Sequence, residues 1–375
     1  MTRSTDLSYR LLAARFIRRQ AKQLAEQLDG IRQGDDDIEW IHRARVASRR
    51  LRAALQMFGD CWGRKKIKRW RKQIRKITCG LGEARDKDVQ IEFLSGMLGA
   101  TAEKGHAPGI ARLLARVERE REWWQPRVCE AVERLAASRV LRQMQQAGKR
   151  VLARAAAGPI ELGELARSET KRFILEQLRQ MLQEEDSLES PEDDRRHHAM
   201  RIAAKRLRYT LEIANPLYAG RLDDCIEATR KVQSLLGDVH DCDVWLQHLD
   251  AFQRAECLRI LAYFGSTLRW SRLQPGINYL RHDRCERRRQ AFSELVRYWE
   301  ELKRQGTWQR LVRVVEEPQG AVGAGELPPA AVRIASAPAA PAAPSQAEGA
   351  GPAQPPGRSK TNGSPPPREP LTAGR

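Results

Sequence analysis

The sequence HRARVASRRLR at residues 42–52 decides the fold class, because a near copy, HAMRIAAKRLR, stands at residues 198–208. The shared pattern is H-x-x-R-[VI]-A-x-[RK]-R-L-R. A second motif follows each copy, LGEARDKDV at residues 81–89 and LGDVHDCDV at residues 236–244. Two motifs that recur in the same order predict an internal duplication, with two related halves in one chain.

The sequence around these motifs has the periodicity of α-helices. In residues 7–28, apolar side chains return mostly every three or four positions, and Gly30 follows as a breaker. Runs of alternating β-branched residues are absent. We therefore expect an all-α bundle, in which four of the later helices cover residues 110–124, 127–155, 223–235 and 241–263.

A change of composition near residue 317 marks the end of this helical region. Thirteen of the 19 prolines lie in residues 318–375, together with many Ala, Gly and Ser residues. Such a segment has too little apolar surface to offset the entropy of ordering it. The sequence predicts a folded region over residues 7–316, with halves at about 7–155 and 160–316, and a disordered tail over residues 317–375.

The charge balance favours a polyanionic partner. The 375 residues contain 67 Lys and Arg against 48 Asp and Glu, which gives a formal net charge of +19. The tail carries only five basic and three acidic residues, so the folded region holds nearly all of this excess. No apolar run reaches the roughly 18 residues needed to cross a bilayer, and no secretory signal is visible. The seven cysteines form no CxxC pair. We expect a cytoplasmic protein without a disulfide scaffold or a membrane partner.

The repeated basic motif places its charges on one helix face. At about 100° per residue, His42, Arg45, Arg49 and Arg52 share one stripe. The stripe covers about 15 Å, which suits an extended chain of anions better than one isolated phosphate. The second copy repeats the spacing with His198, Arg201, Lys205 and Arg208. Ala44, Ser48, Leu51, Leu55 and Phe58 fall on the neighbouring face, which we expect to pack into the core.

Further basic residues extend these stripes. A dense run occupies residues 64–72, and two basic pairs align between the copies. A solvated helix surface is the alternative interpretation of such runs. The complete set of candidate anion ligands is His42, Arg45, Arg49, Arg50, Arg52, Lys65, Lys66, Arg75, Lys76, His198, Arg201, Lys205, Arg206, Arg208, Arg230 and Lys231.

The acidic motifs have two interpretations. Asp86 and Asp241 could cap the helices that follow a glycine turn, or pair with the basic stripes. They could instead bind a hard cation, but the spacing D-x-D is common and no EF-hand pattern is present. Phosphate-binding glycine loops and nucleophile elbows are also missing. We expect helix capping and ion pairing, with no metal and no cofactor.

The four motif blocks closely resemble the CHAD family, the conserved histidine α-helical domain. The resemblance covers about residues 7–316 and leaves only the tail outside. It implies two pseudo-symmetric four-helix halves, a basic central cavity, and binding of inorganic polyphosphate, in some bacteria on polyphosphate granules. Lys205 departs from Arg49 of the first copy, and the loss of the guanidinium fork makes that position less specific. Many relatives also carry a triphosphate-hydrolysing domain, but no E-x-E-x-K stretch is visible here.

Three functions account for the charge pattern. The first is non-catalytic binding of inorganic polyphosphate, which is the function we expect. The second is binding of nucleic acid, although the basic stripes contain no aromatic residue beyond the adjoining Tyr209 on which bases could stack. The third is a metal-dependent phosphatase or phosphotransferase that would use His42 or His198 with the acidic motifs. The sequence does not indicate an oligomeric state.

Overall fold

The computed structural model describes residues 7–33, 38–101, 105–156 and 164–317 of the chain. These residues form α-helices joined by short turns and three 3-10 helices, and they contain no strand. This confirms the all-α prediction, while the predicted tail from residue 318 onward lies outside the described residues. The helices are α1 Leu7–Arg32, α2 Glu39–Met57, α3 Arg64–Gly80, α4 Gly82–Ala100, α5 Ala107–Ala137, α6 Val140–Ala155, α7 Glu164–Leu182, α8 Asp194–Ala214, α9 Asp223–Phe264, α10 Gln274–Arg304 and α11 Thr307–Glu316.

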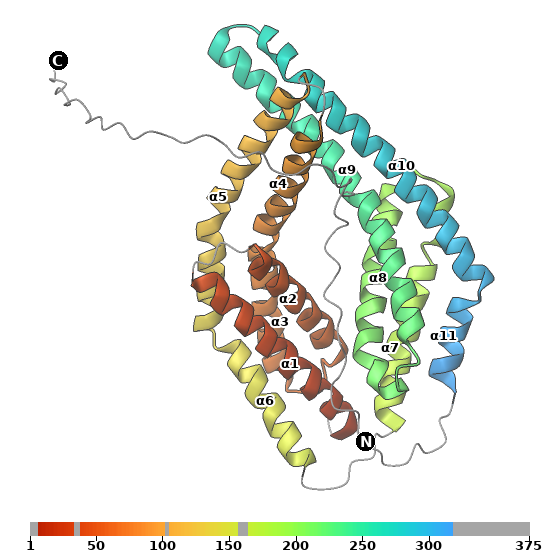
Figure 1. The fold of residues 1–375 in the computed structure, drawn as a ribbon. Helices are drawn as coiled ribbons and strands as arrows, with labels where there is room; N and C mark the ends of the chain where they lie inside the picture. The colour runs from red at the N-terminus through yellow and green to blue at the C-terminus, as the bar shows by residue number, and fades with distance from the viewer. Residues whose placement is uncertain (1–6, 34–37, 102–104, 157–163, 318–375) are drawn as a thin grey trace, which may run out of the picture. The chain divides into compact units, whose positions relative to one another are not determined.

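Many helices pack against the next helix along the chain, and others join segments that are far apart in the sequence (Figure 1). Helix α1 lies between α2 and α6, and α8 lies between α7 and α9. Helices α2 and α8, which carry the two copies of the basic motif, pack against each other. The first half of the chain thus meets the second at its repeated motif, while the duplication of the halves stays a prediction from the sequence.

The main core lies where the apolar faces of these helices meet. On α2, Leu51, Leu55 and Phe58 are fully buried, as the periodicity of the motif predicts. On α8, Leu207 and Leu211 occupy the corresponding interior. Each such side chain contributes about 1.5–3 kcal/mol when it is removed from water, so this packing fixes the relative rotation of the two motif helices.

A second core holds the long helices together beyond the motif region. It is formed by buried residues of α4, α5, α9 and α10, among them Leu94, Leu113, Leu249, Phe252 and Ile277. In this core α5 packs against α10, and α10 also packs against α9. It therefore sets the position of the polar residues that border it on α5 and α9.

Two glycines allow α5 and α10 to approach closely. A Cβ atom on Gly109 would lie 2.1 Å from the carbonyl oxygen of Leu273, and one on Gly276 would lie 2.2 Å from that of His106. Each added Cβ would also lie 3.0–3.1 Å from the Cα atom of the other glycine. The backbones of the two helices are in direct contact there, which no larger residue permits.

Several predicted helix boundaries are wrong. Gly30 lies inside α1, and α5 continues through Pro126 to Ala137. The predicted helix over 127–155 is interrupted instead at Arg139, which has a left-handed φ of 55°. The predicted break at residues 236–240 is absent, because α9 is one helix of 42 residues. Where a helix continues through an expected breaker, burial of the flanking apolar residues, such as Val117 and Val128 around Pro126, outweighs it.

Candidate functional site

The two basic motifs converge on one surface between α2 and α8. Helix α2 presents arginines there because the opposite side of the helix is apolar and buried in the core. Helix α8 begins at a capped N-terminus, where the carboxylate of Asp193 accepts a hydrogen bond from the backbone N–H of Arg196 at 3.1 Å. We call the converging residues the central cluster: Arg45 and Arg49 of α2, Arg201 and Lys205 of α8, Asp86 of α4 and Asp241 of α9.

Lys205 has the most perturbed charge of this cluster. Burial, followed by the positive charges of Arg49 and Arg201, lowers its pKa from 10.5 to about 7. Asp241 opposes that shift but does not cancel it. The charged form of Lys205 is thus much less favoured than in an exposed lysine, first because the side chain is buried and then because the cations around it outnumber the acids.

Arg201 experiences the same excess of positive charge. Burial lowers its pKa most strongly, and Arg49 and Arg45 lower it further. Its Nε atom is buried and has no hydrogen-bond partner within the described residues. A guanidinium in such surroundings offers donors to an incoming anion.

Two aspartates lie beside the cations at matching positions of the acidic motifs. Asp86 accepts a hydrogen bond from Nη1 of Arg45 at 2.6 Å, and the same Nη1 also donates to the carbonyl of Gly82. The negative charge of Asp241, on α9, acts on Arg201 and raises the pKa of that guanidinium, against the larger effect of burial. Asp241 is exposed to solvent, and yet burial is the main cause that raises its pKa.

The predicted capping role of these aspartates is wrong. Helix α4 begins at Gly82 and α9 at Asp223, so Asp86 and Asp241 both lie inside a helix. The predicted ion pairing is confirmed for Asp86, which pairs with Arg45. The acid two positions later in each motif also pairs with an arginine, Asp88 with Arg121 and Asp243 with Arg288.

Both motif histidines lie next to other basic groups. Burial and then Arg85 lower the pKa of His42, and burial and then Arg201 lower that of His198. The ring of His198 lies 4.8 Å from that of His240, whose pKa falls to about 4 through burial and Arg201. These histidines are neutral near pH 7 without a ligand, and a bound polyanion would raise their pKa values.

Two predicted ligands lie within ion-pair distance of one acid, although neither of their Nε atoms makes a hydrogen bond among the described residues. Nε of Arg50 lies 3.4 Å from Glu212, and Nε of Arg208 lies 3.7 Å from the other oxygen of the same carboxylate. All three side chains are at most 17% exposed. One carboxylate thus links α2 to α8 through one arginine from each motif copy, and this link holds the two stripes in place.

The other predicted ligands lie outside the central cluster. Arg230 pairs with Glu227 in the preceding turn of α9, and Nζ of Lys231 lies 4.0 Å from the ring centroid of Tyr298. The remaining ones are on exposed faces of α2, α3 and α8, namely Arg52, Lys65, Lys66, Arg75, Lys76 and Arg206.

Four residues of this region were absent from the predicted ligand set. Arg85 and His240 occupy the same position of the acidic motif, directly before Asp86 and Asp241, and each lies beside a motif histidine. Aligning the two motif copies with each other would have indicated both. Asp241 belongs to the acidic motif and was expected only as an ion-pairing acid. Glu212 has no such signal, because only the packing of α2 against α8 brings it to the arginines.

The described residues contain no group of three or more His, Cys, Asp or Glu side chains that could hold a metal ion. Across residues 7–33, 38–101, 105–156 and 164–317, none of the helices has the length and apolar character to span a bilayer. All seven cysteines have free thiols.

Comparison with known proteins identifies the kind of domain. A family model described as the CHAD domain matches residues 15–250, a range that contains both basic and both acidic motifs. A solved structure, the CHAD domain from the plant Ricinus communis, is similar at 18% identity. The similarity covers 85% of this chain and 94% of that one, with a TM-score of 0.49. No curated protein matches the chain.

Proposed function

This chain belongs to the CHAD domain family, which is associated with polyphosphate binding, and we propose that it binds inorganic polyphosphate at the central cluster without turning it over. One observation carries the proposal. Four cations, Arg45, Arg49, Arg201 and Lys205, gather beside the carboxylates of Asp86 and Asp241. Burial, reinforced by the charges of Arg49 and Arg201, lowers the pKa of Lys205 to about 7. A polyanion is the ligand that removes this repulsion.

The cluster also has the geometry that a chain of phosphates requires. Its arginines come from two facing helices, so phosphate oxygens can accept paired N–H bonds from both sides. The acid that pairs with Arg45 is itself 57% exposed, so a phosphate can compete with it for the guanidinium. Binding then exchanges the pair with Asp86 for stronger contacts with several phosphate groups. Localisation on polyphosphate granules would follow from the same contacts.

The test is direct binding of size-graded polyphosphate to wild type and to Arg45→Glu/Arg201→Glu. Two lost charge-assisted contacts, each worth about 1.5–3 kcal/mol, predict an affinity at least about 100-fold lower. The control is Arg142→Glu/Arg150→Glu, which changes the net charge equally on exposed positions of α6. We expect the control to lose no more than about threefold at physiological salt, where distant charges are screened.

Equal losses in the two variants would contradict the site and indicate non-specific attraction. Competition separates the ligand classes: long-chain polyphosphate should displace labelled RNA at a far lower phosphate concentration than RNA displaces polyphosphate. The reverse order would contradict the proposal in favour of nucleic-acid binding. Release of orthophosphate from polyphosphate by the pure protein would contradict the absence of turnover.

A further inference from the structure

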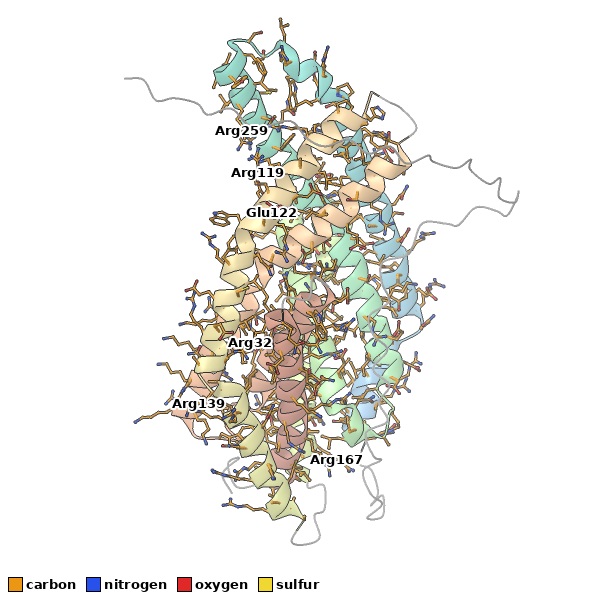
Figure 2. All side chains as sticks on the ribbon, turned by 60° about the vertical axis from the view of Figure 1, so that its left-hand side comes forward. Arg32, Arg119, Glu122, Arg139, Arg167 and Arg259 are labelled. Carbon is orange, nitrogen blue, oxygen red and sulfur yellow. The ribbon has the colours of Figure 1, made fainter. Side chains whose placement is uncertain are left out.

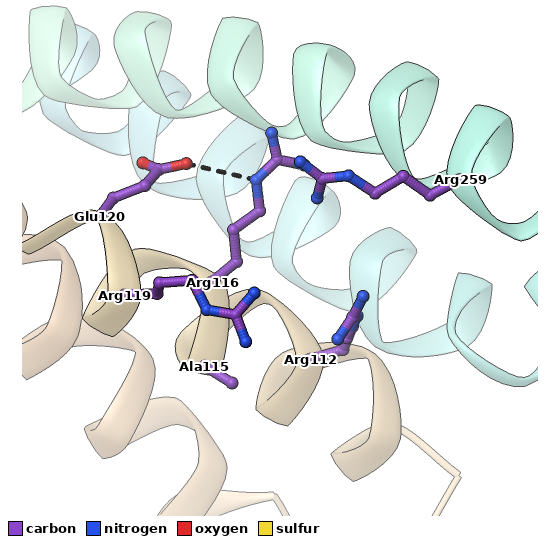
Figure 3. Close-up of a pocket in the computed structure, with 6 residues that line it drawn as sticks. All are labelled: Arg112, Ala115, Arg116, Arg119, Glu120 and Arg259. Carbon is purple, nitrogen blue, oxygen red and sulfur yellow. Dashed lines mark hydrogen bonds and ion pairs between the residues drawn. The ribbon is translucent and has the colours of Figure 1, made fainter. Parts of the chain in front are cut away.

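A second group of arginines lines a recess of about 120 Å³ between α5 and α9 (Figure 3). Arg112, Arg116 and Arg119 come from one face of α5, at spacings of four and three residues, and Arg259 comes from α9. Ala115 and Glu120 complete the lining. We call this site the α5–α9 recess. None of its residues belongs to the repeated motifs.

The acids at the recess do not balance its cations. Glu256, only 3% exposed, lies 2.6 Å from Arg112 and 3.4 Å from Arg259, so it serves two arginines at once. Glu120 is likewise shared, between Arg116 at 3.2 Å and Lys87 of α4 at 2.7 Å. Arg119 makes no ion pair within the described part of the chain. Five cations therefore meet two carboxylates.

The arginines of the recess also hold unused donors. Nη1 of Arg116 is buried without a hydrogen-bond partner among the described residues, and its guanidinium lies over the ring of Phe252 at 5.5 Å. Figure 3 shows the side chain of Arg259 reaching from α9 toward that of Arg116. Figure 2 shows Arg119 and Arg259 on the same side of the molecule. Like charges that converge in this way are stabilised by an oxyanion between them.

Two consecutive residues of α4 reach the central cluster and the recess. Asp86 pairs with Arg45 at the cluster, and Lys87 pairs with Glu120 at the recess. From Asp241 to Arg259, α9 advances 18 residues, or about 27 Å. A flexible polyanion held at the central cluster can therefore continue along α9 into the recess.

We propose that the α5–α9 recess is a second phosphate-binding subsite, which takes the continuation of a polyphosphate chain bound at the central cluster. The inference rests on the proposed function and adds a substrate preference to it. Once one part of a chain is bound, its remainder reaches the recess at a high effective concentration. Chains long enough to occupy both sites bind more tightly than short ones.

The test compares tripolyphosphate with long-chain polyphosphate by titration calorimetry. The variant Arg119→Ala/Arg259→Ala removes one exposed arginine from each wall and leaves Arg112 on Glu256. We expect its affinity for the long chain to fall about tenfold, which corresponds to about 1.4 kcal/mol, with no change for tripolyphosphate. The control Arg142→Ala/Arg150→Ala should keep both affinities, and thermal melting verifies that each variant is folded.

The outcomes separate the recess from the central cluster. If the recess variant binds the long chain as the control does, while Arg45→Glu/Arg201→Glu loses both ligands, the recess is overturned and the proposed function stands. If tripolyphosphate binding falls with the recess variant, the recess takes short phosphates on its own and the shared-chain proposal is overturned. If Arg45→Glu/Arg201→Glu binds both ligands normally, the proposed function fails and the recess inference fails with it.

Discussion

At the scale of single residues, Lys205 reports the state of the central cluster. Its pKa of about 7 reflects burial first and the facing Arg49 and Arg201 next. In the free protein this lowered pKa destabilises the fold below about pH 7, where the side chain must carry its charge. The destabilisation disappears as the pH rises toward 10.5, the unperturbed pKa of the lysine. An anionic ligand reverses the effect, because it favours the charged ammonium.

Polyphosphate affinity should therefore depend on pH through Lys205. Bound phosphate raises the pKa of the lysine above 7, so binding takes up protons near and above that pH. We expect the affinity to fall by up to about tenfold per pH unit as the pH rises above about 7, until the pKa of the bound state is passed. The measurement is calorimetry in buffers of different ionisation enthalpy, which also counts the protons taken up.

Lys205→Arg is the matched control, because arginine stays charged over this range and restores the residue found at Arg49 of the first motif. The affinity of Lys205→Arg for polyphosphate should not change with pH between 7 and 9 through this residue. A pH dependence equal to that of wild type would contradict the role of Lys205. The pKa values of His42 and His198 are lowered below 6.5 in the free protein, so their own contribution to the pH dependence begins at a lower pH than that of Lys205. His42→Ala/His198→Ala removes that lower part of the profile.

Only those residues of the central cluster that belong to the repeated motifs could be predicted from the sequence. The equal spacing of the two motifs was enough to predict that Arg45 and Arg49 share one surface with Arg201 and Lys205. The spacing did not show that Arg50 and Arg208 turn to a shared acid, because Glu212 lies outside the motif and reaches them through packing alone. The recess was not predicted either, since its arginines come from helices that meet only in the fold.

At the scale of helices, the crossing of α5 and α10 leaves no room for a side chain between the two backbones. Gly109 and Gly276 bring two backbones together, and α5 is thereby seated beside α9, where the recess forms. The helix boundaries show why such contacts escape sequence reasoning. Pro126 inside α5 and Gly237 inside α9 are breakers by composition, but tertiary packing on both sides keeps each helix intact.

Gly276→Ala should destabilise the protein by about 1–3 kcal/mol, because the new Cβ would lie 2.2 Å from a backbone oxygen that cannot rotate away. Chemical denaturation measures the effect. The control is Gly96→Ala in α4, where a Cβ meets nothing within 4 Å. That change should stabilise the helix by up to about 1 kcal/mol, since alanine is the better helix former. A neutral Gly276→Ala would contradict the close crossing.

At the scale of the whole molecule, the net positive charge governs the general attraction to polyanions. The net charge of +19 attracts any polyanion, so specific binding must be separated from this general attraction. Salt provides the separation, because a ligand that contacts several phosphate-binding groups releases a matching number of counterions. The all-α class and the basic surface were predictable from composition and periodicity, whereas the place where the charges gather required the tertiary structure.

The logarithm of the affinity for long-chain polyphosphate should fall linearly with the logarithm of the salt concentration. About five neutralised phosphates predict a slope of about −3 to −4, by analogy with single-stranded nucleic acid. Fluorescence anisotropy in graded NaCl measures it. Arg45→Glu/Arg201→Glu should flatten the slope, while Arg142→Glu/Arg150→Glu, with the same net charge, should keep it. Identical slopes in both variants would mean that only total charge matters.

The continuity of α9 has a consequence for how ligand length is sensed. The helix runs without interruption for 42 residues, about 63 Å, and carries Asp241 near its middle and Arg259 near its end. The helix has no break between Asp241 and Arg259, so the distance between the two sites is fixed before a ligand binds. Under the proposed two-site binding, a chain gains the second contact only when it is long enough to reach Arg259, so we expect the affinity to rise in a step with chain length.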